Sequence, residues 1–401
     1  MPDTVYTNST QRNVALLAAC QALLFTNNST LIAINGLAGL ALAPHAGLAT
    51  LPVTGWVLGG AIGTMPASLH MKSVGRQRGL TTGTLWGIVG ALICGAAIWA
   101  QSFWLLCFGT LVFGVYNAYG QYYRFAAADV ASRDFKDTAI SLVVAGGLVG
   151  GILGPTTSRY TVGLIEPKFM GAYLVLIGFA VATMILLRFI RIPTPGLAER
   201  SAAGRPLREI AAQPKYLIAV TAAAIGYGVM NFLMTSTPIA MQVCGHPYGD
   251  AAFVISSHII GMFAPSFFTG RLIRAIGVLR VMFAGALLNF AAIGIALAGI
   301  AVANFWWSLV ILGVGWNFLY IGGTTLLTES YRPEERAKAQ GLNEQAIFTM
   351  MAISSLTSGL TVTTAGWERV NLFALPLVAA VAMAIAWFAL RSRARKGAAA
   401  A

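Results

Sequence analysis

Residues 281–328 read VMFAGALLNFAAIGIALAGIAVANFWWSLVILGVGWNFLYIGGTTLLT and contain no Asp, Glu, Lys or Arg. A membrane crossing takes about 20 apolar residues, so this run holds two crossings and a short turn. Residues 13–71 and 79–123 lack charge in the same way. Only 10% of the 401 residues are charged, whereas about 25% are charged in a soluble domain. A soluble enzyme is therefore excluded, and the sequence indicates a polytopic helical membrane protein.

Clusters of charge between the apolar runs mark the ends of the predicted crossings. A polar segment over 191–215 divides the chain into an N-terminal six-helix half, 1–190, and a C-terminal half, 216–401, which ends in a short basic tail. The predicted fold is an all-α membrane protein. Its twelve expected transmembrane helices cover 13–36, 49–71, 79–100, 103–126, 138–158, 169–190, 216–241, 250–272, 279–301, 304–328, 339–363 and 369–390.

The basic residues predict the orientation of these helices. All but Arg159, Lys168 and Arg369 of the 26 Lys and Arg residues fall on one side of the predicted topology. Because cytoplasmic loops carry the excess of Lys and Arg, both termini are expected in the cytoplasm. This spread over many loops also accounts for the net charge of +13 without a nucleic-acid partner. The expected surroundings are a lipid bilayer.

The two halves resemble copies of each other, which is the sign of an internal repeat. After a shift of 200 positions, Asp129 falls on Glu329, Lys136 on Arg336, Leu142 on Leu342 and Tyr116-Asn117 on Trp316-Asn317.

Two six-helix halves joined by a polar loop, with both ends inside, resemble the major facilitator superfamily over essentially the whole chain. The loop after the second helix corresponds to that family's Gly-x-x-x-Asp-Arg-x-Gly-Arg site. Gly75, Arg76 and Arg78 are kept, but Ser68 replaces the first Gly and Lys72 replaces the Asp. The resemblance therefore leaves open the gating ion pair usual at this loop. It implies a substrate site near the bilayer midplane between two halves that rock around it.

Sulfur and imidazole groups recur on the seventh and eighth predicted helices. Met230 and Met234 form one i, i+4 pair, and His258 and Met262 form another, so each pair shares a helix face. By rise per residue, Met234 and His258 lie about 12 Å below the outer helix ends, and Met230 and Met262 about 18 Å. Neutral thioether and imidazole ligands select soft or borderline metals, above all Cu(I). The alternative from spacing alone is that the Met residues only fill gaps in the core.

Met-x-x-x-Met followed by His-x-x-x-Met is similar to the motif pair of the CcoA-type copper importers. These bacterial major facilitator proteins bring copper into the cytoplasm for maturation of cbb3-type cytochrome c oxidase. The resemblance implies that Met230, Met234, His258 and Met262 bind copper as the transported substrate, with no cofactor. It also implies a monomeric protein of the bacterial inner membrane, with periplasmic or cytoplasmic copper chaperones as partners.

Three residues near the outer loop of this hairpin are candidates for metal entry. Cys244 and His246 flank Gly245 in the loop itself, and Met241 precedes it. A thiolate and an imidazole there would capture Cu(I). A simple loop turn around Gly245 and Pro247 is the equal alternative.

Amides and one acid within the helices are candidates for a cavity or gate. Asn117 and Asn317 occupy equivalent positions of the two halves, and Asn28 lies in the first helix. Because buried amides need partners, we expect them to tie helices together, with cavity lining as the alternative. Glu344 is the acid well inside a helix. We expect it to form an inner-gate ion pair with a Lys or Arg, and proton coupling is the alternative.

The function expected from these features is copper import by alternating access. A major facilitator for a small organic solute, such as a drug or siderophore, is the rival within the class. It would need an aromatic and polar cavity, which Tyr116, Tyr119, Tyr122 and Trp316 would furnish. A membrane copper sensor is the rival from another class, and the chain has no output domain to support it. No Gly-x-x-x-x-Gly-Lys-Ser/Thr loop occurs, so an ATP-driven pump is not expected. No Ser/His/Asp constellation or zinc motif stands out, so an enzyme is not expected either.

Overall fold

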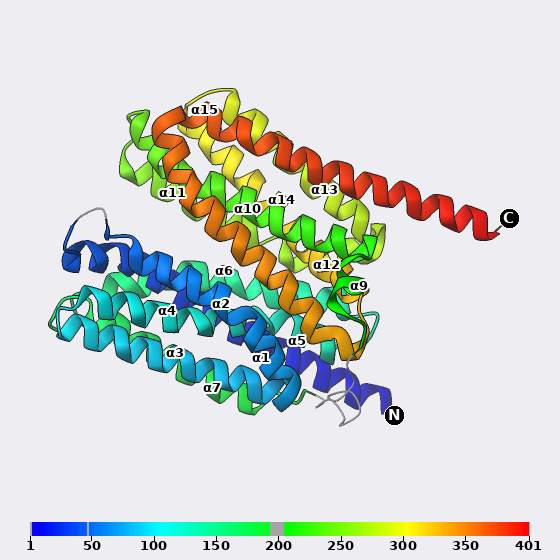
Figure 1. Cartoon of the computed structure of the whole chain (residues 1–401), viewed down its shortest axis with the longest axis horizontal. Coiled ribbons are helices and arrows are strands. Elements are labelled where there is room, and N and C mark those ends of the chain that lie inside the picture. The colour runs from blue at the N-terminus through cyan, green and yellow to red at the C-terminus, as the bar shows by residue number, and fades with distance from the viewer. Residues whose placement is uncertain (1, 46–47, 193–203, 401) are drawn as a thin grey trace. The chain divides into compact units, whose positions relative to one another are not determined.

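The computed structural model describes residues 2–45, 48–192 and 204–400, and every regular element in these ranges is helical (Figure 1). The chain forms two compact units. Unit 1 contains residues 1–204 and 333–348, and unit 2 contains residues 205–332 and 349–401. The absence of strands from the described ranges confirms the predicted all-α fold.

Unit 1 contains the helices of the N-terminal half together with the start of the last long helix. Its elements are α1 (Pro2–Leu42), α2 (Leu51–Val74), α3 (Arg76–Trp99), α4 (Phe103–Gly120), α5 (Tyr123–Val130), α6 (Lys136–Thr161), α7 (Met170–Arg188), the 3₁₀ helix η2 (Pro333–Glu335) and the first residues of α15 (Arg336–Ala400).

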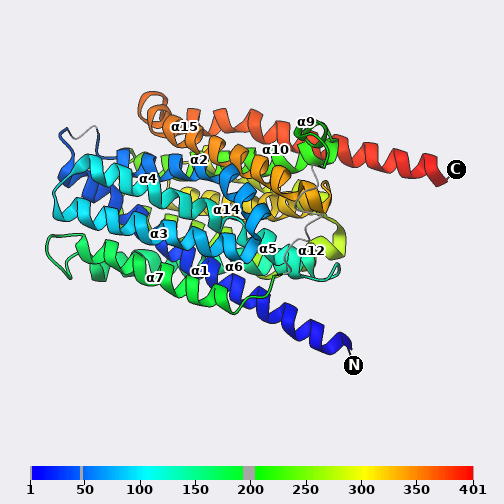
Figure 2. The same ribbon diagram turned by 60° about the horizontal axis from the view of Figure 1, so that its bottom comes forward.

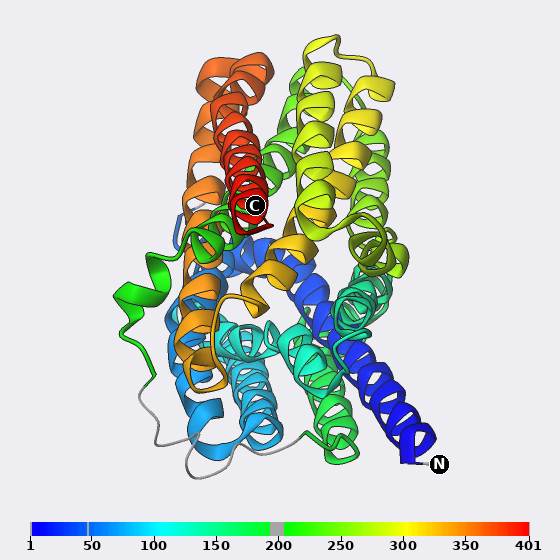
Figure 3. The same ribbon diagram turned by 90° about the vertical axis from the view of Figure 1, so that its right-hand side faces the viewer.

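Unit 2 contains the remaining helices. They are α9 (Leu207–Ala211), α10 (Pro214–Val243), α11 (Tyr248–Phe263), α12 (Ser266–Ile276), α13 (Val278–Leu297), α14 (Val302–Thr328) and the rest of α15. Within α15, Gly366 adopts φ 80° and ψ 173°, which is not helical. The helix turns back on itself at this residue, as the orange and red arms show in Figure 3. The two last predicted crossings are the two arms of α15.

Length and apolar composition identify the membrane-crossing helices. In the described part of the chain, nine helices are long and apolar enough to cross a membrane, or ten when the bent pair of α11 and α12 is taken as one span. The 24-residue α2 occupies the second predicted crossing, and α15 contains two. Each of the twelve expected crossings therefore has a helix. The chain is a multi-pass membrane protein.

Glycines bring neighbouring helices into close contact, as is usual between transmembrane helices. On α3, Gly83 and Gly87 leave room for the side chains of Tyr119 and Tyr116 on α4, and Gly90 lies against the backbone of Phe113 on the same helix. The two helices lie side by side in Figures 1 and 2. On α6, Gly150 and Gly154 lie directly against the backbone of α1. An added Cβ at any of these glycines would overlap its neighbour.

The repeat is visible in one backbone turn of each half. Gly75, the residue that follows α2, has φ 91° and ψ 154°, and Gly277, the residue that follows α12, has φ 92° and ψ 147°. Only glycine adopts these angles without strain, so each of the two loops requires a glycine at this position. The helix breaks differ, however. In unit 1 the break falls between α4 and α5, whereas in unit 2 it falls at Ala264 and Pro265, between α11 and α12.

Candidate functional site

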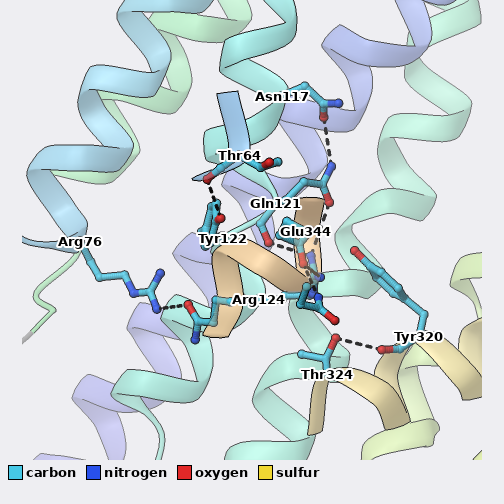
Figure 4. A network of polar contacts seen from close by, with 11 residues as sticks. Thr64, Arg76, Asn117, Gln121, Tyr122, Arg124, Tyr320, Thr324 and Glu344 are labelled. Carbon is cyan, nitrogen blue, oxygen red and sulfur yellow. Dashed lines mark hydrogen bonds and ion pairs between the residues drawn. The ribbon is translucent and has the colours of Figure 1, made fainter. Parts of the chain in front are cut away.

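Polar side chains form a continuous hydrogen-bonded series in the interior of unit 1. Asn28 donates its Nδ2–H to Oδ1 of Asn117 at 2.8 Å, and Gln121 donates to the same oxygen at 3.0 Å. Arg124 donates to the Gln121 carbonyl oxygen at 2.8 Å and to the Glu344 carboxylate at 2.5 Å. Figure 4 shows the part of this series that runs from Asn117 through Gln121 and Arg124 to Glu344. We call Asn28, Asn117, Gln121, Arg124, Asn343 and Glu344 the polar chain.

The sequence places three of these residues on one line. Asn117, Gln121 and Arg124 follow at intervals of four and three, which is the spacing of one helix face. The break between α4 and α5 falls among them, and Tyr122 anchors it by donating its hydroxyl to the Thr64 carbonyl oxygen on α2 at 2.8 Å. Gln121 is therefore held at a helix end beside the buried charge of Arg124.

Arg124 and Glu344 form a buried ion pair. Their side chains are 3% and 1% exposed. Asn343 donates to the same carboxylate oxygen at 2.7 Å, and the Arg124 guanidinium lies 4.5 Å from the centre of the Phe125 ring. Such added contacts offset the cost of taking two charges out of water. The partner of Glu344 is thus an Arg of the same unit, on α5.

The loop after α2 also forms ion pairs within unit 1. Arg76 Nε lies 2.7 Å from Asp129, and Arg336 Nη1 lies 3.0 Å from the same carboxylate oxygen. Ser68 donates its hydroxyl to the Ala337 carbonyl oxygen at 2.8 Å. Asp129 of α5 is therefore the acid that pairs with Arg76 of this loop, where Lys72 replaces the Asp of the family site.

Four aromatic side chains pack together in unit 2. Trp316 and Tyr320 on α14 are stacked, with ring centres 4.8 Å apart and planes 16° apart. Tyr227 on α10 meets Trp316 edge-on at 5.3 Å, and Phe263 on α11 does so at 5.7 Å. The indole Nε1–H of Trp316 is buried without a hydrogen-bond partner in the described structure. We call Tyr227, Phe263, Trp316 and Tyr320 the aromatic cluster.

Tyr116, Tyr119 and Tyr122, which the sequence offers for an aromatic cavity together with Trp316, lie in unit 1. Tyr116 donates its hydroxyl to Thr183 at 3.4 Å, and the Tyr119 hydroxyl lies 2.9 Å from His70 Nδ1. Tyr122 donates to Thr64, as described above. Each hydroxyl joins two helices of unit 1, so these tyrosines contribute to helix packing there.

Asn317 binds the helix break in unit 2. Its Nδ2 donates to the Met262 carbonyl oxygen at 2.7 Å and to the Ser266 hydroxyl at 2.6 Å. Its Oδ1 accepts from the Thr269 hydroxyl at 2.7 Å. The break before α12 frees a carbonyl of α11, and Asn317 of α14 satisfies it. Both oxygen and nitrogen of this amide are therefore occupied.

The four predicted copper ligands lie on two helices of unit 2, Met230 and Met234 on α10 and His258 and Met262 on α11. Gly226 on α10 packs on Leu319 of α14. The backbones of His258 and Met262 lie against Gly313 of the same helix. Both pairs are thus carried by helices that pack on α14. Met230, His258 and Met262 are buried, and Met234 is partly exposed.

His258 has one occupied and one free ring nitrogen. Its Nδ1–H donates to the Leu309 carbonyl oxygen at 2.6 Å, and its buried Nε2 has no hydrogen-bond partner in the described structure. In residues 2–45, 48–192 and 204–400, no three His, Cys, Asp or Glu side chains are grouped as a metal site. A copper site here would have to rely on thioether sulfur besides this imidazole.

The candidate entry residues sit around the end of α10. Cys244 is partly exposed and caps the helix, and Met241 is fully buried. His246 Nε2–H donates to the Ile300 carbonyl oxygen at 2.7 Å, and its ring packs edge-on against Phe305. In the structure His246 therefore joins two loops of unit 2.

Sequence reasoning missed several residues of these two groups. Arg124 enters the sequence-based prediction only as one of the 26 Lys and Arg residues, and its interval of three from Gln121 is the signal that could have found it. Two tyrosines could have been found by their spacing along the helices. Tyr227 lies one helical turn before Met230-Asn231, and Tyr320 lies one turn after Trp316. Nothing in the sequence indicated that Tyr227 and Tyr320 would meet, because they lie on different helices.

The sequence model of the Major Facilitator Superfamily matches residues 17–343 and 245–401 of this chain. The chain belongs to this superfamily. Membership makes it a membrane transporter rather than an enzyme, and it agrees with the helical fold described above. The copper-importing type within the superfamily does not follow from this match.

One sequence relative and two solved structures are similar to this chain over most of its length. The chain is 40% identical over 376 residues to the riboflavin transporter RfnT of Brucella anthropi, which covers 92% of this chain and 94% of the relative. Among solved structures, the transporter FucP in its outward conformation has a TM-score of 0.76 at 16% identity, covering 94% and 99% of the two chains. The human organic anion transporter MFSD10 has a TM-score of 0.77 at 11% identity, with the same coverage. The structural likenesses show the fold alone.

Proposed function

We propose that this superfamily member transports riboflavin or a chemically close, flat heteroaromatic solute. The relative that is 40% identical over 92% of the chain supports this proposal, because it is a riboflavin transporter. The small-organic-solute alternative to copper import is thereby the favoured function. We further propose that the protein lies in the inner membrane of a bacterium, in line with its relative from Brucella anthropi. Both termini would lie in the cytoplasm, as the distribution of Lys and Arg favours.

The single geometric observation that carries the proposal is the aromatic cluster. Flat heterocycles bind well to aromatic side chains because ring faces and edges attract each other in stacked and edge-on arrangements. Tyr227, Trp316 and Tyr320 provide such faces and edges within one unit. The free Nε1–H of Trp316 adds a donor for a ring nitrogen or carbonyl oxygen. An apolar site with a few placed polar groups is the usual form of a small-molecule site.

Uptake of labelled riboflavin by a bacterial strain that lacks both riboflavin synthesis and its own transporter tests the proposal. Cells expressing this chain should grow on low riboflavin and accumulate label. Trp316→Ala should reduce the initial rate about 10-fold through lost stacking. Trp307→Ala is the matched control, since Trp307 is 52% exposed and should leave uptake unchanged. Absence of uptake by the unmodified protein, present in the membrane, would refute the proposal.

Copper import is a second candidate function, favoured by the ring of His258. A metal-binding imidazole usually donates its other N–H to a carbonyl, which fixes the free nitrogen for the metal. His258 makes such a bond to Leu309 and keeps Nε2 free. In this alternative, Met230, Met234 and Met262 provide the thioether sulfur, and copper chaperones would deliver or receive the ion. The transporter would act as a monomer.

Copper accumulation distinguishes the two candidates. Cells expressing Met230→Ile or His258→Leu should accumulate as much copper as cells with the unmodified protein if riboflavin is the substrate. A loss of copper in both variants, with riboflavin uptake unchanged, would instead establish the copper function.

A further inference from the structure

The polar chain of unit 1 contains three buried acceptor atoms that have no partner in the described structure. They are Asn28 Oδ1, Asn343 Oδ1 and the second carboxylate oxygen of Glu344, Oε2. All three residues are at most 5% exposed. Buried polar atoms are nearly always hydrogen-bonded in folded proteins. Three free acceptors in one hydrogen-bonded series therefore mark a place prepared for a ligand.

The hydrogen bonds already present identify these atoms as acceptors. A carboxylate only accepts, so the Asn343 atom that contacts Glu344 must be nitrogen, and the free atom is oxygen. Asn117 Oδ1 accepts from both Asn28 and Gln121. Arg124 only donates and contacts Gln121 Oε1 at 3.5 Å, so the Gln121 atom that contacts Asn117 is nitrogen and the Asn117 atom is oxygen. The contacting atom of Asn28 is thus nitrogen as well, and its free atom is also oxygen.

We propose that the polar chain binds the hydroxyl groups of a neutral, polyhydroxylated part of the transported solute. This inference rests on the proposed function, because riboflavin carries a polyol chain on its flat ring. Hydroxyl groups donate hydrogen bonds, which is what free acceptors require. The Asn28 and Asn343 oxygens each take one donor, and Glu344 Oε2 takes the strongest one, since bonds to a charged acceptor are about twice as strong.

The same geometry predicts which solutes are rejected. The charge of Arg124 is already matched by Glu344 at 2.5 Å. No positive charge of the polar chain is thus left for an anion, and a phosphate would bring further acceptors towards atoms that need donors. A phosphorylated form of the solute should therefore bind much more weakly than the neutral alcohol.

Competition between two flavins tests this inference. Riboflavin and lumiflavin share the ring, but lumiflavin has a methyl group in place of the polyol chain. Inhibition of labelled riboflavin uptake by each unlabelled compound, and by riboflavin phosphate, is measured for the unmodified protein. It is repeated for Asn28→Ala and Asn343→Ala. The unmodified protein should prefer riboflavin to both other compounds. In each variant the preference for riboflavin over lumiflavin should fall about 10-fold, because one hydrogen bond to the polyol chain is lost.

Asn13→Ala is the matched control. Asn13 lies on the same helix as Asn28 and is 8% exposed, but both of its polar atoms are bonded to the backbone of Arg191. The Asn13→Ala variant should prefer riboflavin to lumiflavin as strongly as the unmodified protein does. Uptake by the unmodified protein combined with unchanged preference in Asn28→Ala and Asn343→Ala would overturn this inference alone. No flavin uptake at all would overturn the proposed function and this inference with it.

Discussion

Asn117 and Asn317 stand 200 positions apart at equivalent places of an internal repeat, and the structure uses them differently. Asn317 binds a freed carbonyl and two hydroxyl groups at the break between α11 and α12. Asn117 instead accepts from two other amides, in a series that ends on a buried ion pair. The amide in unit 2 is fully occupied by the fold, whereas the amide in unit 1 belongs to a series with free acceptors.

At the residues next to these amides the difference is reversed: the polar group of unit 1 is hydrogen-bonded, and that of unit 2 is unpaired. Tyr116 packs into the space left by Gly87, and its hydroxyl is bonded to Thr183. Trp316 is part of the aromatic cluster and keeps a free indole N–H. Unit 1 therefore contains buried acceptor atoms without a partner in the described structure, and unit 2 contains a buried indole N–H without one. The two halves share their helices, but they differ in which side chains at equivalent positions are hydrogen-bonded.

The largest expected difference between the halves concerns their ion pairs. Glu344→Leu leaves Arg124 buried without its partner and should reduce the free energy of unfolding by about 4 kcal/mol. Glu329→Leu removes the exposed pair with Lys215, whose two side chains are 36% and 47% exposed. It should change the stability by less than about 1 kcal/mol. Thermal unfolding of the purified proteins in detergent measures both.

The double variant Arg124→Met with Glu344→Leu is the control for this ion pair. Because it removes both charges, it should recover most of the stability lost in the single variant. Equal losses in Glu344→Leu and Glu329→Leu would contradict the difference between the halves. So would a double variant that is as unstable as the single one.

A smaller effect is expected at the two equivalent amides. Asn317→Ala leaves the Met262 carbonyl buried and unpaired, and we expect a loss of about 3 kcal/mol. We expect a smaller loss of unfolding free energy in Asn117→Ala, because the hydrogen-bonded series that contains Asn117 already includes unpaired acceptors. The preference for riboflavin over lumiflavin should fall in Asn117→Ala and stay constant in Asn317→Ala. The opposite pattern would reverse the roles assigned to the two halves.

Sequence reasoning predicted the helices and the repeat more fully than the site. Long charge-free runs fix where helices cross a membrane, because the bilayer accepts no unpaired backbone. The position of Glu344 inside a helix also pointed to an ion pair. Its partner Arg124 and the meeting of Tyr227 with Trp316 depend on how different helices pack. Contacts of that kind are set by tertiary structure, and periodicity within one segment does not contain them.

The smallest effects are expected where the halves are alike. Gly75 and Gly277 have φ values of 91° and 92° at the ends of α2 and α12. Alanine at either position should cost about 2 kcal/mol, because the strain lies in the backbone. At Gly277 an added Cβ would contact nothing within 4 Å, so crowding does not contribute. Equal losses of stability in Gly75→Ala and Gly277→Ala are the expected result.

Two helical glycines serve as controls for this last pair. Gly178 on α7 and Gly294 on α13 also have no atom within 4 Å of an added Cβ. Alanine at these positions should be neutral or stabilising by up to about 1 kcal/mol, since it favours the helix. If Gly75→Ala were costly and Gly277→Ala behaved like Gly294→Ala, the two turns would not be equivalent. The repeat would then extend to the helices but not to the loops that join them, and the differences between the halves would begin at the backbone.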